Sequence, residues 1–504
     1  MLRRFLDLPL VVILMGIGAV FMYFPAAHAA ATRDHEVMRI FFYSGTLFLL
    51  LTAFIGIAMA NREVTSQSRS HLLAMLAALT ILPMMLAVPF MMAAGSASFL
   101  DAYFEMVSSV TTTGATLYSD PGSIPPSAHL WRAMVGWLGG FFMLVTAVAI
   151  LAPMNLGGFE VMSSASTGQA GARDSDSVWA TDGSVLLQRF TLRLFPVYAG
   201  LTTFLWIMLL ILGETPLTAL CHSMSVLATS GISPVGGIAG GQAGIGGEVL
   251  VFLLLIPAIS RQSIVRDRRD VSGGMKSDPE FRLGLLLVIV APLFLFFRHW
   301  FGAYEAEMQT DLIAGLSALW GGTFTVLSFL TTTGFESASW EAARDWSGLP
   351  TPGLVLMGLG LVGGGVATTA GGVKLLRVYA LYKASIRELE RLVHPSSLGG
   401  DGSVARRLRR EGAYVAWIFF MLFALSLSLI ALLLAATGLD FETATVLAIA
   451  GLSTTGPMVN IADIPISYEM LGAPGKLILM AAMVLGRLET LAIIAMFNPD
   501  FWRR

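Results

Sequence analysis

Four short turns rich in threonine and serine, each ending in glycine, are the part of this sequence best suited to hold an ion. They occupy residues 111–114, 228–231, 331–334 and 453–456, and each follows a short apolar segment. Glycine tolerates backbone angles that direct successive carbonyl oxygens toward one point. A ring of such carbonyls can replace the hydration shell of a desolvated cation. The pattern therefore predicts four similar units around one axis, with a cation at the centre.

The composition places these turns in a membrane protein. The chain is 55% hydrophobic and only 13% charged, with a mean hydropathy of +0.74, whereas soluble domains carry about 25% charged residues. A net charge of −2 without a basic domain gives no indication of nucleic-acid binding. The single cysteine excludes a disulfide framework within the chain.

Apolar stretches long enough to cross a membrane alternate with shorter ones that end at the four turns. A spanning helix needs about 20 residues, and non-helical backbone at membrane depth is tolerated only where it is buried or lines a water-filled cavity. We therefore expect an all-α polytopic membrane protein with two N-terminal helices and four helix–pore loop–helix repeats around a pseudo-fourfold central pore. The expected spans are 8–26, 38–60, 71–95, 128–152, 188–212, 248–265, 283–302, 350–372, 413–437 and 471–497, the short segments are 100–111, 217–228, 317–330 and 442–453, and the units are 1–69, 70–155, 156–270, 271–400 and 401–504.

The distribution of charge predicts the orientation of these spans. Most lysines and arginines fall in loops on one side, and positive residues stay in the cytoplasm. Both termini are therefore expected to be cytoplasmic, with the four turns facing outward. Residues 1–30 resemble a secretory signal, but their apolar run is long, which favours a retained helix. Acidic residues near the turns should concentrate cations at the outer mouth; they are Asp120, Glu214, Glu336, Glu341, Asp345, Asp440, Glu442 and Asp463.

A glycine-rich stretch at residues 363–374 ends the eighth expected span. We expect it to unwind, because so many glycines beside small residues will not hold a straight helix, and to obstruct the pore below the turns. A phosphate-binding loop is excluded, since Leu375 follows Lys374 and no strand precedes, whereas a glycine-rich helix-packing face stays open as an alternative. The candidate gate residues are Gly363, Gly364, Gly365, Thr368, Thr369, Gly371, Gly372 and Lys374.

Arg487 lies inside the last expected span. A charge within a span costs about 2.5 kcal/mol or more and is a functional-site hypothesis by default. The alternative is a structural contact with Glu489 or with a loop carbonyl. Glu489 follows by only two residues, so the two side chains should point to different faces of a helix. We therefore do not expect a direct pair between these two residues, and a functional role for Arg487 and a structural contact with a loop carbonyl both stay open.

Three features together make the chain resemble the TrkH/TrkG/KtrB/HKT superfamily of potassium transporters. They are the four turn segments (107–116, 225–234, 327–337 and 447–457), the glycine-rich stretch 363–374, and the sequence Gly-Arg-Leu-Glu-Thr at 486–490. The two additional leading helices favour the TrkH branch. The resemblance implies a potassium filter in which carbonyls of the residues before the glycines bind K⁺; its residues are Thr113, Gly114, Ser230, Gly231, Thr333, Gly334, Thr455 and Gly456.

The same resemblance implies how the protein works and with what. It implies potassium uptake across the bacterial inner membrane, a gating role for 363–374, and Arg487 facing the cavity below the filter. It also implies a homodimer and a cytoplasmic TrkA-type regulator that binds NAD or ATP. No nucleotide is expected on this chain itself, and the chain is not expected to be an enzyme. Cation-coupled symport, with H⁺ or Na⁺, and a potassium-binding subunit of a pump stay open as alternatives. The sequences at 230–234 and at Pro457 depart from the common family pattern, which leaves the ion selectivity open.

Overall fold

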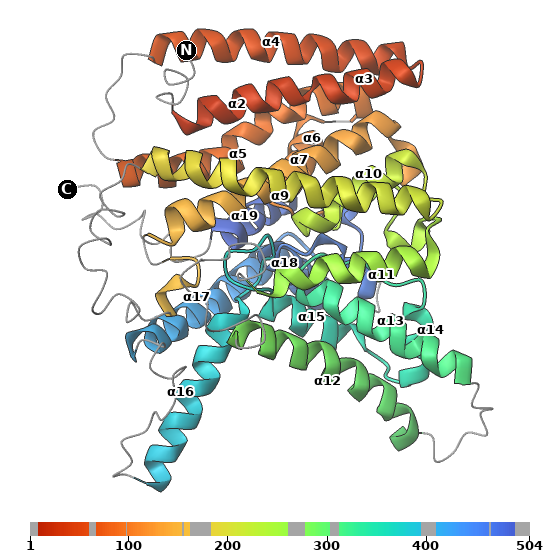
Figure 1. Cartoon of the computed structure of the whole chain (residues 1–504), viewed down its shortest axis with the longest axis vertical. Coiled ribbons are helices and arrows are strands. Elements are labelled where there is room, and N and C mark those ends of the chain that lie inside the picture. Colours follow the sequence, from red (N-terminus) through yellow and green to blue (C-terminus); the bar gives the residue numbers. More distant parts are fainter. Residues whose placement is uncertain are drawn as a thin grey trace.

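The structure is a computed structural model, and it describes most of the chain. The described residues are 9–59, 67–96, 98–153, 156–161, 183–260, 278–302, 312–394, 410–462 and 465–488. Within them the regular elements are helices (Figure 1). Their bounds are α2 Leu10–Phe21, α3 Tyr23–Ala31, α4 His35–Met59, α5 Gln67–Ala94, α6 Phe99–Val110, α7 Pro126–Thr146, α9 Gly183–Ile211, α10 Pro216–Ala228, α11 Gly244–Leu255, α12 Pro279–Gly302, α13 Leu312–Leu330, α14 Trp340–Ser347, α15 Gly353–Val362, α16 Leu375–Val393, α17 Arg410–Ala435, α18 Phe441–Ser453 and α19 Ala473–Leu488.

The helix order agrees with the expected all-α membrane architecture. In the described part of the chain, eight helical segments are long and apolar enough to cross a membrane. Three shorter helices end at the start of a turn: α6 at the first turn, α10 at the second and α18 at the fourth. Each of these helices is 12 or 13 residues long, too short to cross. They are the half-helices that the sequence predicts.

Three expected segments differ from the structure. The half-helix before the third turn, expected at 317–330, is α13, and its 19 residues begin at Leu312 because the apolar run extends backward; its length alone would allow it to cross. The eighth span, expected at 350–372, is wrong in its second half, since α15 ends at Val362 where glycines follow. The sixth span becomes a 3₁₀ turn at Ile256–Ile259, which contains Pro257.

The helices of successive repeats pack in a closed order. The helix that follows each turn contacts the half-helix of the next repeat: α7 contacts α10, α11 contacts α13, and α15 contacts α18. The last helix, α19, contacts α6 of the first repeat. The contacts between repeats therefore form a closed cycle that includes all four half-helices.

The leading helices lie outside this arrangement. Helices α2 and α3 pack against α4, and they contact the first repeat through α5 and α7 (Figure 1). At the other end of the molecule, α16 projects away from the body. The leading pair therefore covers one side of the first repeat and makes no part of the turns.

Candidate functional site

The four turns share one backbone conformation. The residue two positions before each turn glycine is a threonine with a positive φ of 50–57°: Thr112, Thr229, Thr332 and Thr454. The next residue in each turn donates its amide hydrogen to a carbonyl five residues earlier, at 2.8–2.9 Å, which closes the end of the half-helix. A left-handed threonine is uncommon, so its fourfold recurrence supports four copies of one structural unit.

The turns meet one another in a ring. A Cβ added to Gly114 would lie 2.0 Å from the Ser230 carbonyl oxygen, and one on Gly231 would lie 2.3 Å from that of Thr333. The third turn touches the fourth through Gly334, where a Cβ would lie 3.1 Å from Pro457. The contacts therefore run from the first turn to the second, third and fourth in order. We call these four turns the ring.

One hydrogen bond closes the ring. The Gly456 amide donates to the Thr113 carbonyl oxygen, and the two atoms lie 2.5 Å apart. This contact brings together residues of the first and last repeats. It also differs from the expectation for Thr113, because its carbonyl, expected to face an ion, here accepts a hydrogen bond from a neighbouring turn.

A polar side chain in three half-helices holds the segment that follows each glycine. The residue nine positions before the glycine, which we call the brace position, is Glu105, His222 or Thr325 in the first three repeats. His222 Nε2 lies 2.8 Å from Ser233 Oγ, and Thr325 Oγ1 accepts the Ser337 amide at 3.2 Å. Because the brace residues differ in type, no shared motif marks them, and the sequence analysis missed them.

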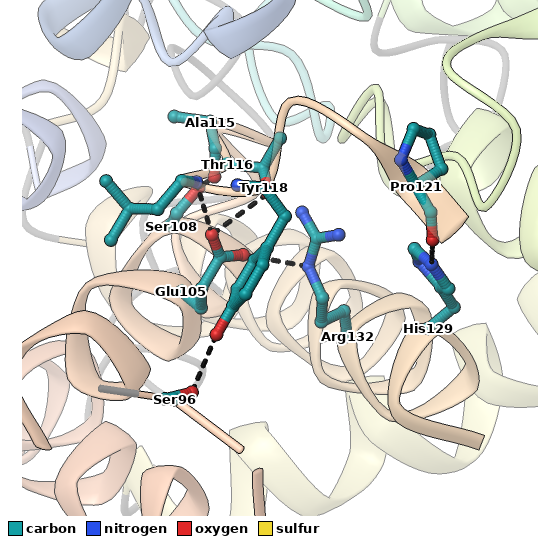
Figure 2. Close-up of polar contacts among 10 residues, drawn as sticks. Ser96, Glu105, Ser108, Ala115, Thr116, Tyr118, Pro121, His129 and Arg132 are labelled. Carbon is teal, nitrogen blue, oxygen red and sulfur yellow. Dashed lines mark hydrogen bonds and ion pairs between the residues drawn. The ribbon is translucent and has the colours of Figure 1, made fainter. Parts of the chain in front are cut away.

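Glu105 makes the most extensive brace (Figure 2). It accepts the Leu117 amide at 2.6 Å and the Thr116 hydroxyl at 3.0 Å, and Arg132 Nε lies 2.8 Å from its second oxygen. Glu105 is 0% exposed and Arg132 4%. Both charges are thus removed from water and compensate each other, which fixes the segment after Gly114 to α6 and α7.

The fourth repeat uses a different residue. Its brace position is Leu447, which cannot form a hydrogen bond through its side chain. Instead, the buried hydroxyl of Tyr468 donates to the Gly456 carbonyl oxygen at 2.7 Å. One carbonyl of a turn glycine is therefore oriented by a side chain, and this residue too was missed from the sequence.

The glycine-rich loop, residues 363–374, is unwound as expected. It joins α15 to α16, and its backbone φ is positive at Gly363, Ala367, Gly372 and Lys374. Gly363 and Gly372 lie so close that a Cβ on either would meet the other's backbone at under 3.0 Å. Glycine is required at these positions because the two backbone segments lie so close together. This contact explains the abundance of glycine, so a helix-packing face is not needed to explain it.

The other loop residues hold the loop to itself and to nearby segments. The Thr368 hydroxyl donates to the Gly365 carbonyl at 2.7 Å, and the buried Lys374 ammonium donates to the Ala370 carbonyl. The Gly365 amide donates to Ala258 at 3.0 Å, and the Gly364 carbonyl accepts the Leu375 amide at 3.0 Å. The loop is therefore anchored at both ends of its unwound backbone.

The glycine-rich loop lies against three of the four turns. The Gly371 amide donates to Thr332 Oγ1 at 2.7 Å. Thr369 Oγ1 lies 3.2 Å from the Leu227 carbonyl and 3.2 Å from Thr229 Oγ1. A Cβ on Gly371 would lie 2.2 Å from Thr454 Oγ1. The loop thus contacts the left-handed threonines of the second, third and fourth turns directly.

Arg487 is buried on α19, with a relative exposure of 5%. The preceding Gly486 packs against the fourth half-helix, since an added Cβ would lie 2.2 Å from the Leu452 carbonyl oxygen. This contact brings the last helix close to the fourth turn. The remainder of the 486–490 sequence, from Glu489 onward, lies outside the described residues.

Several acidic residues expected at the mouth have structural partners. Glu214 is buried and accepts the amides of Gln242 and Ala243, and Asp440 caps α18 through the Thr443 amide. Glu336, two residues after Gly334, is half-buried, and burial raises the pKa of its carboxyl to about 7. Asp463 lies outside the described residues. The acidic mouth is therefore a weaker feature than its composition indicates.

The chemistry available at the ring is that of neutral oxygen ligands. Within the described ranges no group of three or more His, Cys, Asp or Glu side chains gathers as a transition-metal site would require. The ring itself combines carbonyl oxygens with buried threonine and serine hydroxyls. Such oxygens suit a hard cation with little preference for nitrogen or sulfur ligands.

Comparison with known proteins gives consistent matches over nearly the whole chain. The TrkH family of cation transport proteins matches residues 38–236 and 278–504. The Trk system potassium uptake protein TrkH of Salmonella typhimurium is 29% identical, with 92% of each chain covered, and TrkH of Halomonas elongata is 30% identical, with 88% of each covered. The crystal structure of the potassium transporter TrkH from Vibrio parahaemolyticus superposes with a TM-score of 0.79, at 25% identity over 100% of both chains.

Proposed function

Because the chain belongs to the TrkH family of cation transport proteins, we propose that it takes up potassium ions through a single central pore with a four-glycine filter. The observation that carries this proposal is the closed ring, in which Gly114, Gly231, Gly334 and Gly456 each approach the next turn. Relatives that match most of the chain are potassium uptake proteins. Membership in a transport family also agrees with the expectation of a protein that is not an enzyme.

The proposed ligands are the carbonyls of Thr113, Ser230, Thr333 and Thr455. They immediately precede the turn glycines, and the four half-helices end at the ring, each contributing about half a negative charge at its C-terminal end. Both features favour a cation. In this structure the Gly456 amide holds the Thr113 carbonyl, so entry of an ion requires that hydrogen bond to give way to an ion contact.

The proposed gate consists of the glycine-rich loop and Arg487. The loop contacts three turns on the side where α15 becomes α16, and its glycines permit the backbone change that an opening motion needs. We assign the candidate residues 363–365, Thr368, Thr369, 371–372 and Lys374 to this gate. The positive charge of Arg487 would repel a cation that lies below the ring.

The setting of the pore follows from the family and the charge pattern. We propose a multi-pass protein of the bacterial inner membrane with both termini in the cytoplasm. We also propose a homodimer that works with a cytoplasmic TrkA-type subunit, which would carry the NAD or ATP site. These partners are consistent with the Trk system to which the relatives belong.

The test is rubidium uptake into a potassium-uptake-deficient bacterial strain that expresses the chain, competed with potassium and sodium. Gly114→Ser places a Cβ against the Ser230 carbonyl and should change both the rate and the competition by sodium. The matched control is Gly438→Ser, because Gly438 also has a positive φ, of 100°, but has open space around its Cβ position and lies outside the ring.

The outcomes separate the filter from general damage. The filter is supported if potassium competes with rubidium uptake, if Gly114→Ser alters that uptake, and if Gly438→Ser leaves it near the parent level. Strong uptake that is equally unaffected by both substitutions contradicts it. If the chain alone shows no uptake, the assay is repeated with a TrkA-type subunit co-expressed, and absence of uptake there contradicts the proposed transport.

A further inference from the structure

We propose that a cavity between the leading helices and the first repeat holds an acyl chain of a membrane phospholipid. The cavity has a volume of about 370 Å³ and lies among α2, α5, α7 and α9. In Figure 1, α5 lies between α2 and α9, and both pack against it. This inference does not depend on the proposed potassium filter.

The wall of the cavity is almost entirely apolar. Leu14, Leu82, Trp131, Leu138 and Phe142 line it, and its volume falls in the range of ligand sites, about 300–1,000 Å³. Cavities with apolar walls bind apolar molecules. The walls are membrane-spanning helices, so the apolar molecule present at the highest concentration around them is lipid.

The polar groups gather at one end. His71 lies near the start of α5 and Gln188 near the start of α9, and both line the cavity. Among the residues that the structure describes, the buried Nε2 atom of His71 has no hydrogen-bond partner. A polar end on an otherwise apolar cavity fits a phospholipid, with its headgroup on the side predicted to be cytoplasmic and its acyl chain along the apolar wall.

The cavity is accessible from the lipid and reaches the filter region. Ile17 of α2 is 39% exposed and Leu192 of α9 is 68% exposed, and both line it. At its inner end the lining includes Val110, which directly precedes the first turn, and Gly139, whose Cβ position lies 2.1 Å from the Val110 carbonyl. A bound acyl chain would therefore pack against the end of α6.

The experiment labels the lipid site directly. The full chain is reconstituted into phosphatidylcholine vesicles with a small share of phosphatidylglycerol that carries a diazirine in its acyl chain, and adducts are mapped by mass spectrometry after irradiation. We expect adducts at the cavity lining, such as Leu82 and Leu138, to exceed those on the lipid-facing surface of α17 at least several-fold. Ala78→Phe, which fills the cavity, should reduce the lining adducts to the α17 level.

Controls keep the result interpretable. Leu425→Phe changes a residue on α17 that is 66% exposed, and it should leave cavity labelling unchanged. If Ala78→Phe does not yield folded protein, Leu138→Phe fills the same cavity from another helix. Labelling spread evenly over α17 and the cavity, or unaffected by a folded filled variant, would overturn the site.

Discussion

The Gly371 amide donates a 2.7 Å hydrogen bond to the Thr332 hydroxyl, and this bond joins the glycine-rich loop to the third turn of the ring. Both groups are buried. Because Thr332 directly precedes Thr333, whose carbonyl is a proposed ion ligand, displacement of the loop would change the base of the filter. The two proposed functional parts thus share an interface, and any motion of one acts on the other.

Replacement of Thr332 by alanine should favour the open loop. The Gly371 amide would lose its acceptor while the loop stays closed, which costs about 1–3 kcal/mol for a buried donor. We expect rubidium uptake to rise by at least about fivefold where the closed loop limits it. Thr332→Ser keeps the hydroxyl and also lacks the methyl group, so it is the matched control. Equal uptake in the two variants would contradict a role for this bond.

Glu105→Gln should destabilise the protein strongly. It keeps an acceptor for the Leu117 amide but leaves Arg132 buried without its counter-charge, and breaking a buried pair costs about 3–5 kcal/mol. We expect a clear fall in the unfolding temperature of the detergent-solubilised protein. The double variant Glu105→Gln/Arg132→Gln should recover most of that loss. A double variant no more stable than the single one would show that the pair is not coupled as the structure indicates.

Tyr468→Phe should change ion selectivity more than stability. It removes the hydroxyl that orients the Gly456 carbonyl, a bond that contributes about 0.5–1.5 kcal/mol. The ratio of potassium to sodium competition against rubidium uptake should therefore change by about twofold to tenfold. Tyr103→Phe is the control, because the Tyr103 hydroxyl donates to the Thr80 carbonyl, away from the ring. A parent-like selectivity in Tyr468→Phe would argue against this carbonyl as part of the filter.

Uptake should depend on pH through Glu336. Burial raises the pKa of this carboxyl to about 7, with Arg344 lowering it and Glu341 raising it. The carboxylate near Gly334 therefore forms as the pH rises from about 6 to about 8, and the KM for rubidium should fall over that range because a local negative charge concentrates cations. Glu336→Gln should remove this dependence, whereas Glu341→Gln, at an exposed site, should retain it.

The same group gives a stability prediction with a definite sign. The folded pKa of Glu336 lies above the usual value of 4.5, so the folded state holds its proton to a higher pH than the unfolded state. Its stabilising contribution is fully present below about pH 4.5 and is lost as the pH rises through about 7. Unfolding temperatures of the parent and Glu336→Gln should therefore diverge with rising pH. Parallel pH profiles would contradict the raised pKa.

The sequence alone determined the class of fold and the position of the turns. Span length and composition indicated a helical membrane protein, and glycine after a threonine-rich segment located all four turns and the unwound 363–374 loop. These features are local: an apolar run of given length or a glycine at a positive φ is visible in a few consecutive residues. Arg487 was recognised for the same reason, since a charge within a span stands out by itself.

Only the tertiary structure decided which of these parts meet. The ring closes through Gly456 and Thr113, and the loop reaches Thr332 from Gly371; neither pair can be read from sequence, because it depends on the packing of helices from different repeats. The brace position escaped detection because Glu105, His222 and Thr325 differ in type and share only their offset of nine residues from the turn glycine. A backbone that repeats permits side chains to vary, so long as the segment after each glycine is held by some polar group.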